Sequence, residues 1–302
     1  MIVVDLNNIA NACVYASKSG QDPEFLRHSI LNSLRAINSK FGYHYGEMVV
    51  ALDKKSWRYK PFPEYKARRK IKKKKETIDW TSLYEVIHEV FYSIRDNFYW
   101  KTICVEGCEV DDIMGVLARM PNREKILLVT SDKDMKQLLR YSDVEIYDNV
   151  NNKYAELDDP KDFLLELIMT GDSGDDIPNI LSDNDVFIND DKKQRRLIKK
   201  YKDHIREADS IQEGIETLEV NITVDGTKIK LDNEEVLNNF KRNKLLIDLS
   251  HTPQNLAKLV VQQYNTPSEG SESKMRMYFG NHGLNELRDK INDFWGYEIN
   301  AS

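Results

Sequence analysis

Short apolar runs alternate with segments of helical period through the first half of the chain. Three runs of strand length each end in an aspartate: MIVVD, MVVALD and ILLVTSD. Two further runs, KTICVEG and VEIYDN, are typical of strands, and KYAEL is typical of a closing hairpin strand. Between them, segments such as FLRHSILNSLRAINSKF carry apolar residues at helical spacing. The alternation predicts an α/β fold, with a mainly parallel twisted central sheet flanked by helices.

Capping residues set the predicted limits of these helices. Asp22 followed by Pro23 predicts a helix start, and Gly42 predicts the end of that helix. Asp79 predicts the N-cap of the next long helix, WTSLYEVIHEVFYSIRDNF. Two more helices are expected directly after acidic residues, in VDDIMGVLARM and KDMKQLLRY.

The pattern changes after Asp159-Pro160. DDPKDFLLELIMTGDSGDDIPNI predicts a helix, an acidic turn and the start of a second helix. An Asp-Gly pair within EVNITVDGTKIKL predicts a β-hairpin over residues 219–231. NEEVLNNFKRNKLLIDLS and GLNELRDKINDFWGY predict one helix each. We therefore expect an α/β domain over residues 1–159 and a smaller, mostly helical, helix-hairpin-helix-like domain over residues 160–302.

Composition narrows the class of protein. The 302 residues are 31% charged and contain no apolar stretch long enough for a membrane span, so a soluble protein is expected. The amino-terminal run MIVVDLNNI lacks the basic start of a signal peptide. Cys13, Cys104 and Cys108 are odd in number and form no CxxC, so neither a zinc site nor a disulfide framework is indicated, and free thiols in a reducing cytoplasm are favoured. Cys104 and Cys108 as a redox pair is the alternative.

Acidic residues stand where ligands bind in parallel sheets. Asp5, Asp53 and the pair Asp132 and Asp134 follow apolar runs, and Glu109-Val110-Asp111-Asp112 opens a helix. The carboxyl ends of parallel strands face one crevice, so these carboxylates should converge and require a divalent cation. Two such ions can catalyse phosphoryl hydrolysis. The alternative is that these aspartates cap helices or lie in solvated turns.

A fifth acidic cluster spans Gly171 to Asp176, where Asp172 and Asp175 lie three residues apart. An EF-hand is excluded, because the loop lacks alternating ligands and a glutamate at its twelfth position. A plain turn between helices is the alternative to a metal-binding role.

Positive charge is concentrated in one segment despite a net charge of -6. KARRKIKKKK, residues 66–75, holds eight cations among ten residues. Trp57, Tyr59, Phe62 and Tyr65 interleave with cations just before and at its start. Cations bind phosphates and aromatic rings stack on bases, so the segment predicts nucleic-acid binding. The alternative is a solvated charged segment.

Five motifs in order resemble the 5′-nuclease family of flap endonucleases and 5′-3′ exonucleases. They are MIVVDLNNI, VVALD followed by WRYKPFPEYKARRK, CEVDDIMGVLA, VTSDKDMKQLL and GDSGDDIPNI. The resemblance covers about residues 1–181, and the length and tail are similar to those of T-even phage ribonucleases H. It implies a helical arch over about residues 54–78.

The resemblance also implies roles for individual residues. A first Mg²⁺ would be held by Asp5, Asp53, Glu109, Asp111 and Asp132, and a second by Asp112, Asp134, Asp172 and Asp175, with Mn²⁺ able to substitute. Lys66 and Arg69 would steer the scissile phosphate, and Asp132 would be essential for cleavage. Tyr65 and Arg58 would contact a terminal base, and Lys70, Lys72, Lys73, Lys74 and Lys75 would line the arch.

One segment departs from the family pattern. NILSDNDVFINDD replaces a Gly-x-Gly hairpin that binds duplex and often potassium, so a potassium site is in doubt. Duplex contacts would come instead from Lys192, Lys193, Arg195, Arg196, Lys199 and Lys200. An ordinary solvated helix face is the alternative for that cluster.

The expected function is that of a Mg²⁺-dependent 5′-3′ exonuclease and flap endonuclease. It would act on 5′ ends or flaps of duplex DNA and RNA·DNA hybrids, and would remove RNA primers during phage DNA replication. A monomer in the host cytoplasm is expected, and the resemblance implies a single-stranded DNA-binding protein and a sliding clamp as partners. The tail over residues 265–302 would dock such partners, or alternatively would pack on the body of the protein. A non-catalytic nucleic-acid-binding homologue, a metal-dependent phosphatase and a smaller PIN-type ribonuclease are the alternatives.

Overall fold

The computed structural model describes residues 1–16, 22–69, 78–121, 125–224 and 227–295. The chain forms two compact units that are discontinuous in sequence. The first unit comprises residues 1–56, 77–158 and 252–302, and the second comprises residues 57–76 and 159–251. The chain thus enters the second unit at residue 159, beside the predicted boundary, and returns to the first unit at Thr252.

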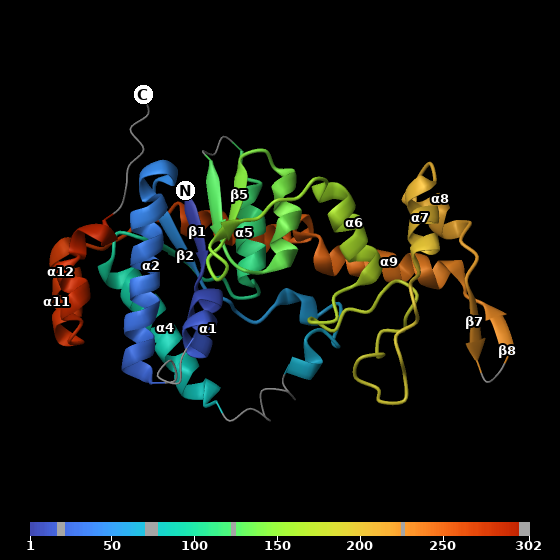
Figure 1. Ribbon diagram of the computed structural model, residues 1–302, viewed down its shortest axis with the longest axis horizontal. Helices are drawn as coiled ribbons and strands as arrows, with labels where there is room; N and C mark the ends of the chain where they lie inside the picture. The colour runs from blue at the N-terminus through green and yellow to red at the C-terminus, as the bar shows by residue number, and fades with distance from the viewer. Residues whose placement is uncertain (17–21, 70–77, 122–124, 225–226, 296–302) are drawn as a thin grey trace. The chain divides into compact units, whose positions relative to one another are not determined.

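A six-stranded sheet forms the centre of the first unit (Figure 1). Its strands are β1 (Ile2–Asp5), β2 (Met48–Ala51), β3 (Lys101–Ile103), β4 (Ile126–Val129), β5 (Val144–Asp148) and β6 (Lys153–Tyr154). They lie in the order β3-β2-β1-β4-β5-β6, and every pair is parallel except β5 with β6. The predicted α/β class with a mainly parallel sheet is confirmed.

Helices bury both faces of this sheet. They include α1 (Leu6–Ala16), α2 (Pro23–Tyr45), α4 (Trp80–Asn97), α5 (Val110–Ala118), the 3-10 helix η3 (Lys133–Arg140) and α10 (Gln254–Tyr264). Ile2 and Val4 join a core cluster with side chains of α1, α2 and α4. Val3, which lies between them and points to the other face, is equally buried. Burial on both faces explains why the strands are continuous apolar runs rather than alternating ones.

Two of the predicted helix starts are present, and one predicted helix end is wrong. The Asp22 carboxylate accepts from the Phe25 N–H at 2.8 Å, and Asp79 accepts from the Ser82 N–H at 3.2 Å. Helix α2 continues through the buried Gly42, ends at Tyr45 and is capped by Gly46 at φ +79°. Tertiary packing therefore overrides the low helix propensity of Gly42, and Gly46 supplies the positive φ of the cap.

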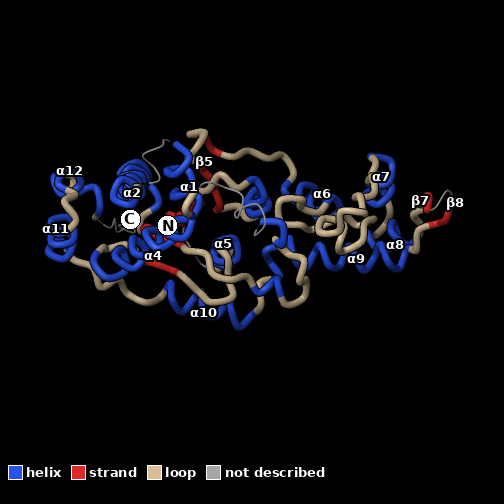
Figure 2. The backbone as a smooth tube through the Cα atoms, turned by 90° about the horizontal axis from the view of Figure 1, so that it is seen from below, coloured by secondary structure: helices blue, strands red, loops and turns tan. Residues whose placement is uncertain are grey.

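The carboxyl-terminal segment belongs to the core of the first unit. It contains α11 (Glu272–Asn281), α12 (Asn285–Asp289) and the 3-10 helix η5 (Ile291–Phe294), beside α2 and α4 (Figure 2). The single helix predicted for GLNELRDKINDFWGY is therefore wrong. Phe279 and Phe294 are fully buried and pack on Phe98, with ring centroids 5.6 and 5.7 Å from it. The predicted alternative that the tail packs on the body holds for these residues.

The second unit is mostly helical. It holds the 3-10 helix η2 (Trp57–Tyr59), α6 (Pro160–Thr170), α7 (Lys199–Glu207), α8 (Ile211–Glu216), the hairpin β7 (Asn221–Val224) and β8 (Thr227–Lys230), α9 (Asn233–Ile247) and η4 (Leu249–His251). Phe62 and Tyr65 pack in one core cluster with residues of α6 and α9. The predicted hairpin over residues 219–231 is thus present, and its Asp-Gly pair lies outside the described residues.

The second helix expected after the acidic turn is not formed. Residues 178–198 contain turns and irregular backbone, and the next helix begins at Lys199. Asn179 explains this, because its side chain accepts from the Leu181 N–H at 3.0 Å and donates to the Arg195 carbonyl at 2.7 Å. Such side-chain bonds compete with helical backbone bonds. No helix among the described residues is long and apolar enough to cross a bilayer.

Candidate functional site

Three of the predicted carboxylates follow neighbouring strands of the sheet. Asp5 is the last residue of β1, Asp53 follows β2 by two residues, and Asp132 follows β4 by three. Strand β1 lies between β2 and β4 and is parallel to both, so the three ends meet at one edge. The order in which successive strands are added to the sheet reverses at β1. Strands β2 and β3 lie on one side of it, and β4 and β5 lie on the other. This is the switch point at which open α/β sheets bind ligands.

The charges of these carboxylates act on one another. Burial, and then the charge of Asp53 and more weakly that of Asp132, raise the pKa of Asp5 to about 7. The Asn8 N–H donates to Asp5 Oδ1 at 2.9 Å and partly offsets this rise. Packing like charges around a half-buried carboxylate is unfavourable without a counter-charge. The carboxylate oxygens of Asp5, Asp53 and Asp132 are therefore suitable ligands for a divalent cation.

Two asparagines after β1 support the same edge. Asn7 Nδ2 donates to Asp53 Oδ2 at 2.5 Å, while the Val110 N–H donates to Asp53 Oδ1 at 2.7 Å. Asn8 Nδ2 donates to Ser131 Oγ at 2.7 Å. The asparagines thus connect the end of β1 to the segments after β2 and β4. Sequence reasoning did not single them out, although their place directly behind the first strand in MIVVDLNNI was a usable signal.

The acidic run before α5 begins the helix. Glu109 and Asp112 form a reciprocal capping box, in which the Glu109 N–H donates to Asp112 Oδ2 at 3.0 Å. Asp112 Oδ1 accepts from Thr252 Oγ1 at 3.2 Å, and Asp112 is fully buried. These contacts give Asp112 a structural role, as the capping alternative supposed, and its place around a metal stays a prediction. Thr252 carried no signal in the sequence.

Asp132 also begins a helix. Its Oδ1 accepts from the Asp134 N–H at 2.8 Å at the start of η3, and its own N–H donates to Thr130 Oγ1 at 3.2 Å. Within the described residues, no group of three or more His, Cys, Asp or Glu side chains is gathered closely enough to hold a metal ion. The negative charges at this edge are suited to a bound cation, but the described side chains do not form a complete coordination shell. The set of metal ligands therefore remains a prediction.

The second unit contains the other acidic cluster, in a tight turn. Gly171 has φ +68°, and Asp172 pairs with Ile177 in an antiparallel bridge. Asp175 accepts from Tyr65 Oη at 3.0 Å, from Lys66 Nζ at 3.3 Å and from Arg69 Nη2 at 2.5 Å. The predicted metal ligand Asp175 is therefore paired with both cations predicted to steer the phosphate.

Arg68 forms a second connection to this turn, which sequence reasoning missed. Its N–H donates to Asp176 Oδ2 at 2.8 Å, its Nε pairs with the other oxygen of Asp176, and its Nη2 donates to the Ser173 carbonyl at 2.6 Å. Asp176 is 1% exposed, so this ion pair is partly desolvated. Residues 65–69 and the turn thus form one hydrogen-bonded assembly.

The other predicted nucleic-acid residues fall into three groups. Arg58 and Tyr65 are buried, and Arg58 Nε donates to the Leu246 carbonyl at 2.7 Å, so both support the fold of this segment. Lys70, Lys72, Lys73, Lys74 and Lys75 lie outside the described residues. In the loop before α7, Lys192 and Arg195 pair with Asp183, both at 3.0 Å, whereas Lys193 and Arg196 are exposed. Lys192 to Arg196 precede the helix and form no helix face, whereas Lys199 and Lys200 of the same predicted cluster are exposed residues of α7.

Family models match nearly the whole chain. The model described as 5′-3′ exonuclease, N-terminal resolvase-like domain, matches residues 1–166. The chain belongs to the 5′-3′ exonuclease and flap endonuclease family. A second family model, described as T4 RNase H, C terminal, matches residues 159–294.

Individual relatives agree with this assignment. The chain is 25% identical to the ribonuclease H of Enterobacteria phage T4 over 303 residues, which cover 97% of this chain and 95% of the relative. It is 28% identical to a 5′-3′ exonuclease of Buchnera aphidicola, over 53% of this chain and 56% of the relative.

Solved structures show the same fold. The flap endonuclease of bacteriophage T5, in a pseudo-enzyme–product complex with DNA and metal ions, matches with a TM-score of 0.64 and 17% identity. That match covers 87% of this chain and 97% of the other. The T5 5′-exonuclease with bound zinc matches with a TM-score of 0.63 and 18% identity, over 87% and 98% of the two chains.

Proposed function

We propose that this protein hydrolyses phosphodiester bonds at the 5′ ends or flaps of duplex DNA and RNA·DNA hybrids, with Mg²⁺ as cofactor, and removes RNA primers during replication. The observation that carries the proposal is the group of mutually repelling carboxylates at the switch point of the sheet, in a chain of this family. The names of relatives support the substrate class, since one is a ribonuclease H and another was crystallised with DNA.

Asp5, Asp53, Glu109, Asp111 and Asp132 are the proposed ligands of a first ion. Asp134, with Asp112, Asp172 and Asp175, is proposed for a second, directly or through water. When bound, such ions lower the pKa of a water molecule and offset charge on the phosphate. Asn7 and the Val110 N–H hold Asp53 in place, and the Asn8 N–H does the same for Asp5. These contacts preorganise the carboxylates before any ion arrives.

Lys66 and Arg69 are proposed to bind the scissile phosphate. Both form ion pairs with the carboxylate of Asp175. A phosphate group has anionic oxygens that can accept from the same donors in place of this carboxylate. A guanidinium and an ammonium at this position would stabilise the charge that develops on the phosphate during hydrolysis. Lys66 and Arg69 therefore exchange one anion for another, at a lower cost than desolvating free cations.

Product length tests the proposal directly. A 5′-labelled flap and a 5′-labelled RNA·DNA hybrid are incubated with Mg²⁺ or with EDTA, using the wild type and Asp132→Asn. The control is Glu156→Gln, which changes an exposed carboxylate of the same unit to an amide. We expect short labelled products only with Mg²⁺, made by the wild type and the control but not by Asp132→Asn.

The other outcomes separate the alternatives. Binding of both substrates without cleavage would favour a non-catalytic homologue, and release of phosphate from small monoesters instead would favour a phosphatase. Full activity of Asp132→Asn would contradict the metal assignment.

A further inference from the structure

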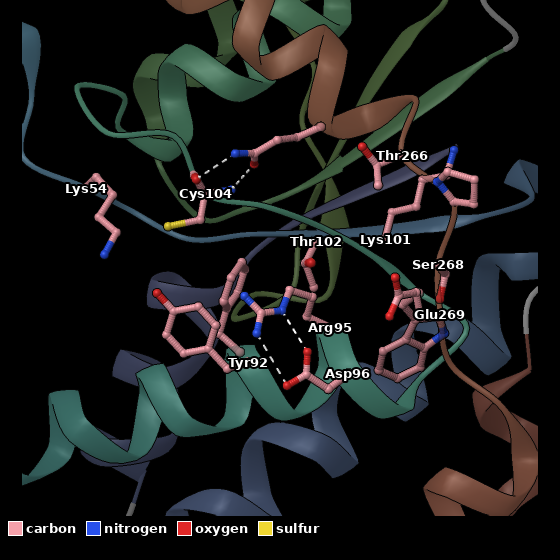
Figure 3. Close-up of a pocket in the computed structure, with 14 residues that line it drawn as sticks. Lys54, Tyr92, Arg95, Asp96, Lys101, Thr102, Cys104, Thr266, Ser268 and Glu269 are labelled. Carbon is pink, nitrogen blue, oxygen red and sulfur yellow. Dashed lines mark hydrogen bonds and ion pairs between the residues drawn. The ribbon is translucent and has the colours of Figure 1, made fainter.

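A cavity of the first unit lies at the β3 edge of the sheet. It has a volume of about 590 Å³ and is lined by residues of α4, of β3 and its flanks, and of segment 263–269 (Figure 3). A volume of that size falls within the range of roughly 300–1,000 Å³ found for small-molecule sites. None of the proposed metal ligands lines it.

Lys54 brings a positive charge to this cavity. Its side chain is half-buried, and no ion pair or hydrogen bond of its ammonium occurs among the described residues. Its charge adds to burial in lowering the pKa of His88, and it partly offsets the burial that raises the pKa of Cys104. The neighbouring cations are neutralised, since Arg95 pairs with Asp96 at 2.8 Å and Lys101 with Glu47 at 3.0 Å. Glu269 adds one carboxylate to the lining, so an anion is favoured at the Lys54 ammonium rather than throughout the cavity.

Trp100 brings a hydrogen-bond donor without an acceptor. It is 1% exposed, and its Nε1 has no hydrogen-bond partner. Its ring is held in place by stacking on Phe294, with centroids 5.4 Å apart at an interplanar angle of 29°. Leaving a buried donor without an acceptor is energetically unfavourable. A ligand with an acceptor oxygen or nitrogen would satisfy it.

Tyr92 and Arg95 supply a planar surface. The Arg95 guanidinium lies over the Tyr92 ring at 4.8 Å from its centroid, and the tyrosine remains 38% exposed. Figure 3 shows both side chains on α4, facing the cavity. Aromatic rings and guanidinium planes stack on bases.

The opposite wall is rigid. Gln263 Oε1 accepts from the Cys104 N–H at 2.8 Å, and Gln263 Nε2 donates to the Cys104 carbonyl at 3.1 Å. This pairing covers the backbone just after β3 as another strand would. The backbone of Cys104 is therefore held by Gln263 on this side of the cavity, and Cys104 lines it.

We propose that this cavity binds a nucleotide, with its phosphate on Lys54, its base on Tyr92 and Arg95, and an acceptor atom on Trp100 Nε1. The inference deepens the proposed function, because a nucleotide is the repeating unit of the proposed substrate. Lys54 directly follows the proposed ligand Asp53 in the chain. The nucleotide could be a residue of a nucleic-acid strand or a free nucleoside monophosphate, and the two share this chemistry.

Protection of Cys104 from alkylation tests the site in the intact protein. The rate at which iodoacetamide modifies Cys104 is measured by mass spectrometry in EDTA, with dAMP, deoxyadenosine or a five-nucleotide DNA strand. Cys13, a half-buried thiol of α1 outside the cavity, is the internal control. We expect dAMP to slow the modification of Cys104 and to leave that of Cys13 unchanged. Deoxyadenosine, which lacks the phosphate, should bind about tenfold more weakly.

Two variants probe the named contacts independently. Lys54→Met and Trp100→Phe should each weaken protection by dAMP about tenfold, since each removes one charged or hydrogen-bonding partner. The control is Lys258→Met, which removes an exposed cation of α10 that does not line the cavity. Protection of Cys104 by the strand at lower concentration than dAMP would assign the nucleotide to a strand, and protection by dAMP alone would assign a free nucleotide. Both support the site.

Absence of protection by dAMP and by the strand would overturn the proposal, as would undiminished protection in both Lys54→Met and Trp100→Phe. Lys54→Met changes a side chain that is not packed in the core, so a folding defect of Trp100→Phe would leave the test intact. Because the measurement uses EDTA and no cleavage, its result is independent of whether the protein proves to be a nuclease.

Discussion

At the scale of single residues, Asp5 has the most unusual environment of the proposed ligands. Burial and the charges of Asp53 and Asp132 raise its pKa to about 7, far above that of a solvated aspartate. The folded metal-free protein therefore binds this proton more tightly than the unfolded chain. The resulting stabilisation is fully present below pH 4 and is lost as the pH rises through 7. The carboxylate that makes the site also destabilises it when no cation is bound.

Asp5→Asn should accordingly stabilise the metal-free protein at high pH. We expect a gain of about 1–3 kcal/mol in the free energy of unfolding at pH 8 in EDTA, and little difference at pH 4. The asparagine oxygen can still accept from the Asn8 N–H, so the local fold is retained. Urea unfolding at both pH values, with EDTA and with Mg²⁺, measures this. Mg²⁺ should stabilise the wild type more than the variant, and a variant less stable than the wild type in EDTA at pH 8 would contradict the account.

At the scale of elements, the acidic turn 171–176 depends on its backbone and on the segment 65–69. A Cβ atom at Gly171 would lie 2.3 Å from the Ile177 carbonyl oxygen, at a φ of +68°. Ion pairs join the turn to segment 65–69, and their side chains differ in how far they are buried. Asp176, the partner of Arg68, is buried, whereas Arg69, a partner of Asp175, has a side chain that is 52% exposed.

Gly171→Ala should therefore destabilise the protein by more than about 2 kcal/mol, because backbone atoms must move and the φ is unfavourable. Gly280→Ala in α11 is the matched control, since a Cβ there meets nothing within 4 Å. That change should stabilise by roughly 0.5–1 kcal/mol through helix propensity. Thermal and urea unfolding of the two variants compare them, and equal stabilities would refute the close approach.

Arg68→Met and Arg69→Met should differ in kind. Loss of Arg68 leaves the buried Asp176 without its cation, so we expect destabilisation of about 2–4 kcal/mol. Loss of the exposed Arg69 should change stability by less than about 1 kcal/mol while lowering the cleavage rate on a 5′ flap substrate. Urea unfolding and single-turnover cleavage separate the two effects. An active, unstable Arg69→Met would reverse the proposed roles.

At the scale of the whole molecule, the acidic net charge of -6 conceals a basic segment that carries the expected contacts with nucleic acid. Neutralising phosphates by cations releases counterions, so affinity falls with salt in proportion to the number of contacts. Many of the described cations are already paired with carboxylates, as Lys192 is with Asp183 and Asp185. Such pairs should contribute less to binding than cations without a carboxylate partner would.

Replacing Lys72 to Lys75 with glutamine should weaken DNA binding and flatten its salt dependence. Each lost contact with duplex phosphate should reduce the slope of log affinity against log salt by about 0.9. Fluorescence anisotropy of a labelled flap between low and moderate salt measures the slope. Lys193→Gln with Arg196→Gln, two exposed cations before α7, is the comparison. A slope unchanged by the four lysine replacements would contradict the predicted arch.

The sequence by itself determined the features that depend on neighbouring residues. Apolar runs specify the strands, Asp22 and Asp79 cap helices through bonds three residues away, and the aspartates at strand ends follow from the parallel order of the sheet. These patterns are local, so periodicity and capping chemistry suffice to predict them. The expected α/β class and the nuclease family follow from the same short motifs.

Only the tertiary structure decided which distant groups meet. The Thr252 bond to Asp112 spans 140 residues, and the Arg68 pair with Asp176 spans 108. Packing carries α2 past Gly42, side-chain bonds of Asn179 replace an expected helix, and Phe279 and Phe294 bring the tail into the first core. No local pattern encodes such pairings, because their energy arises from burial and complementary charge that exist only once the chain has folded.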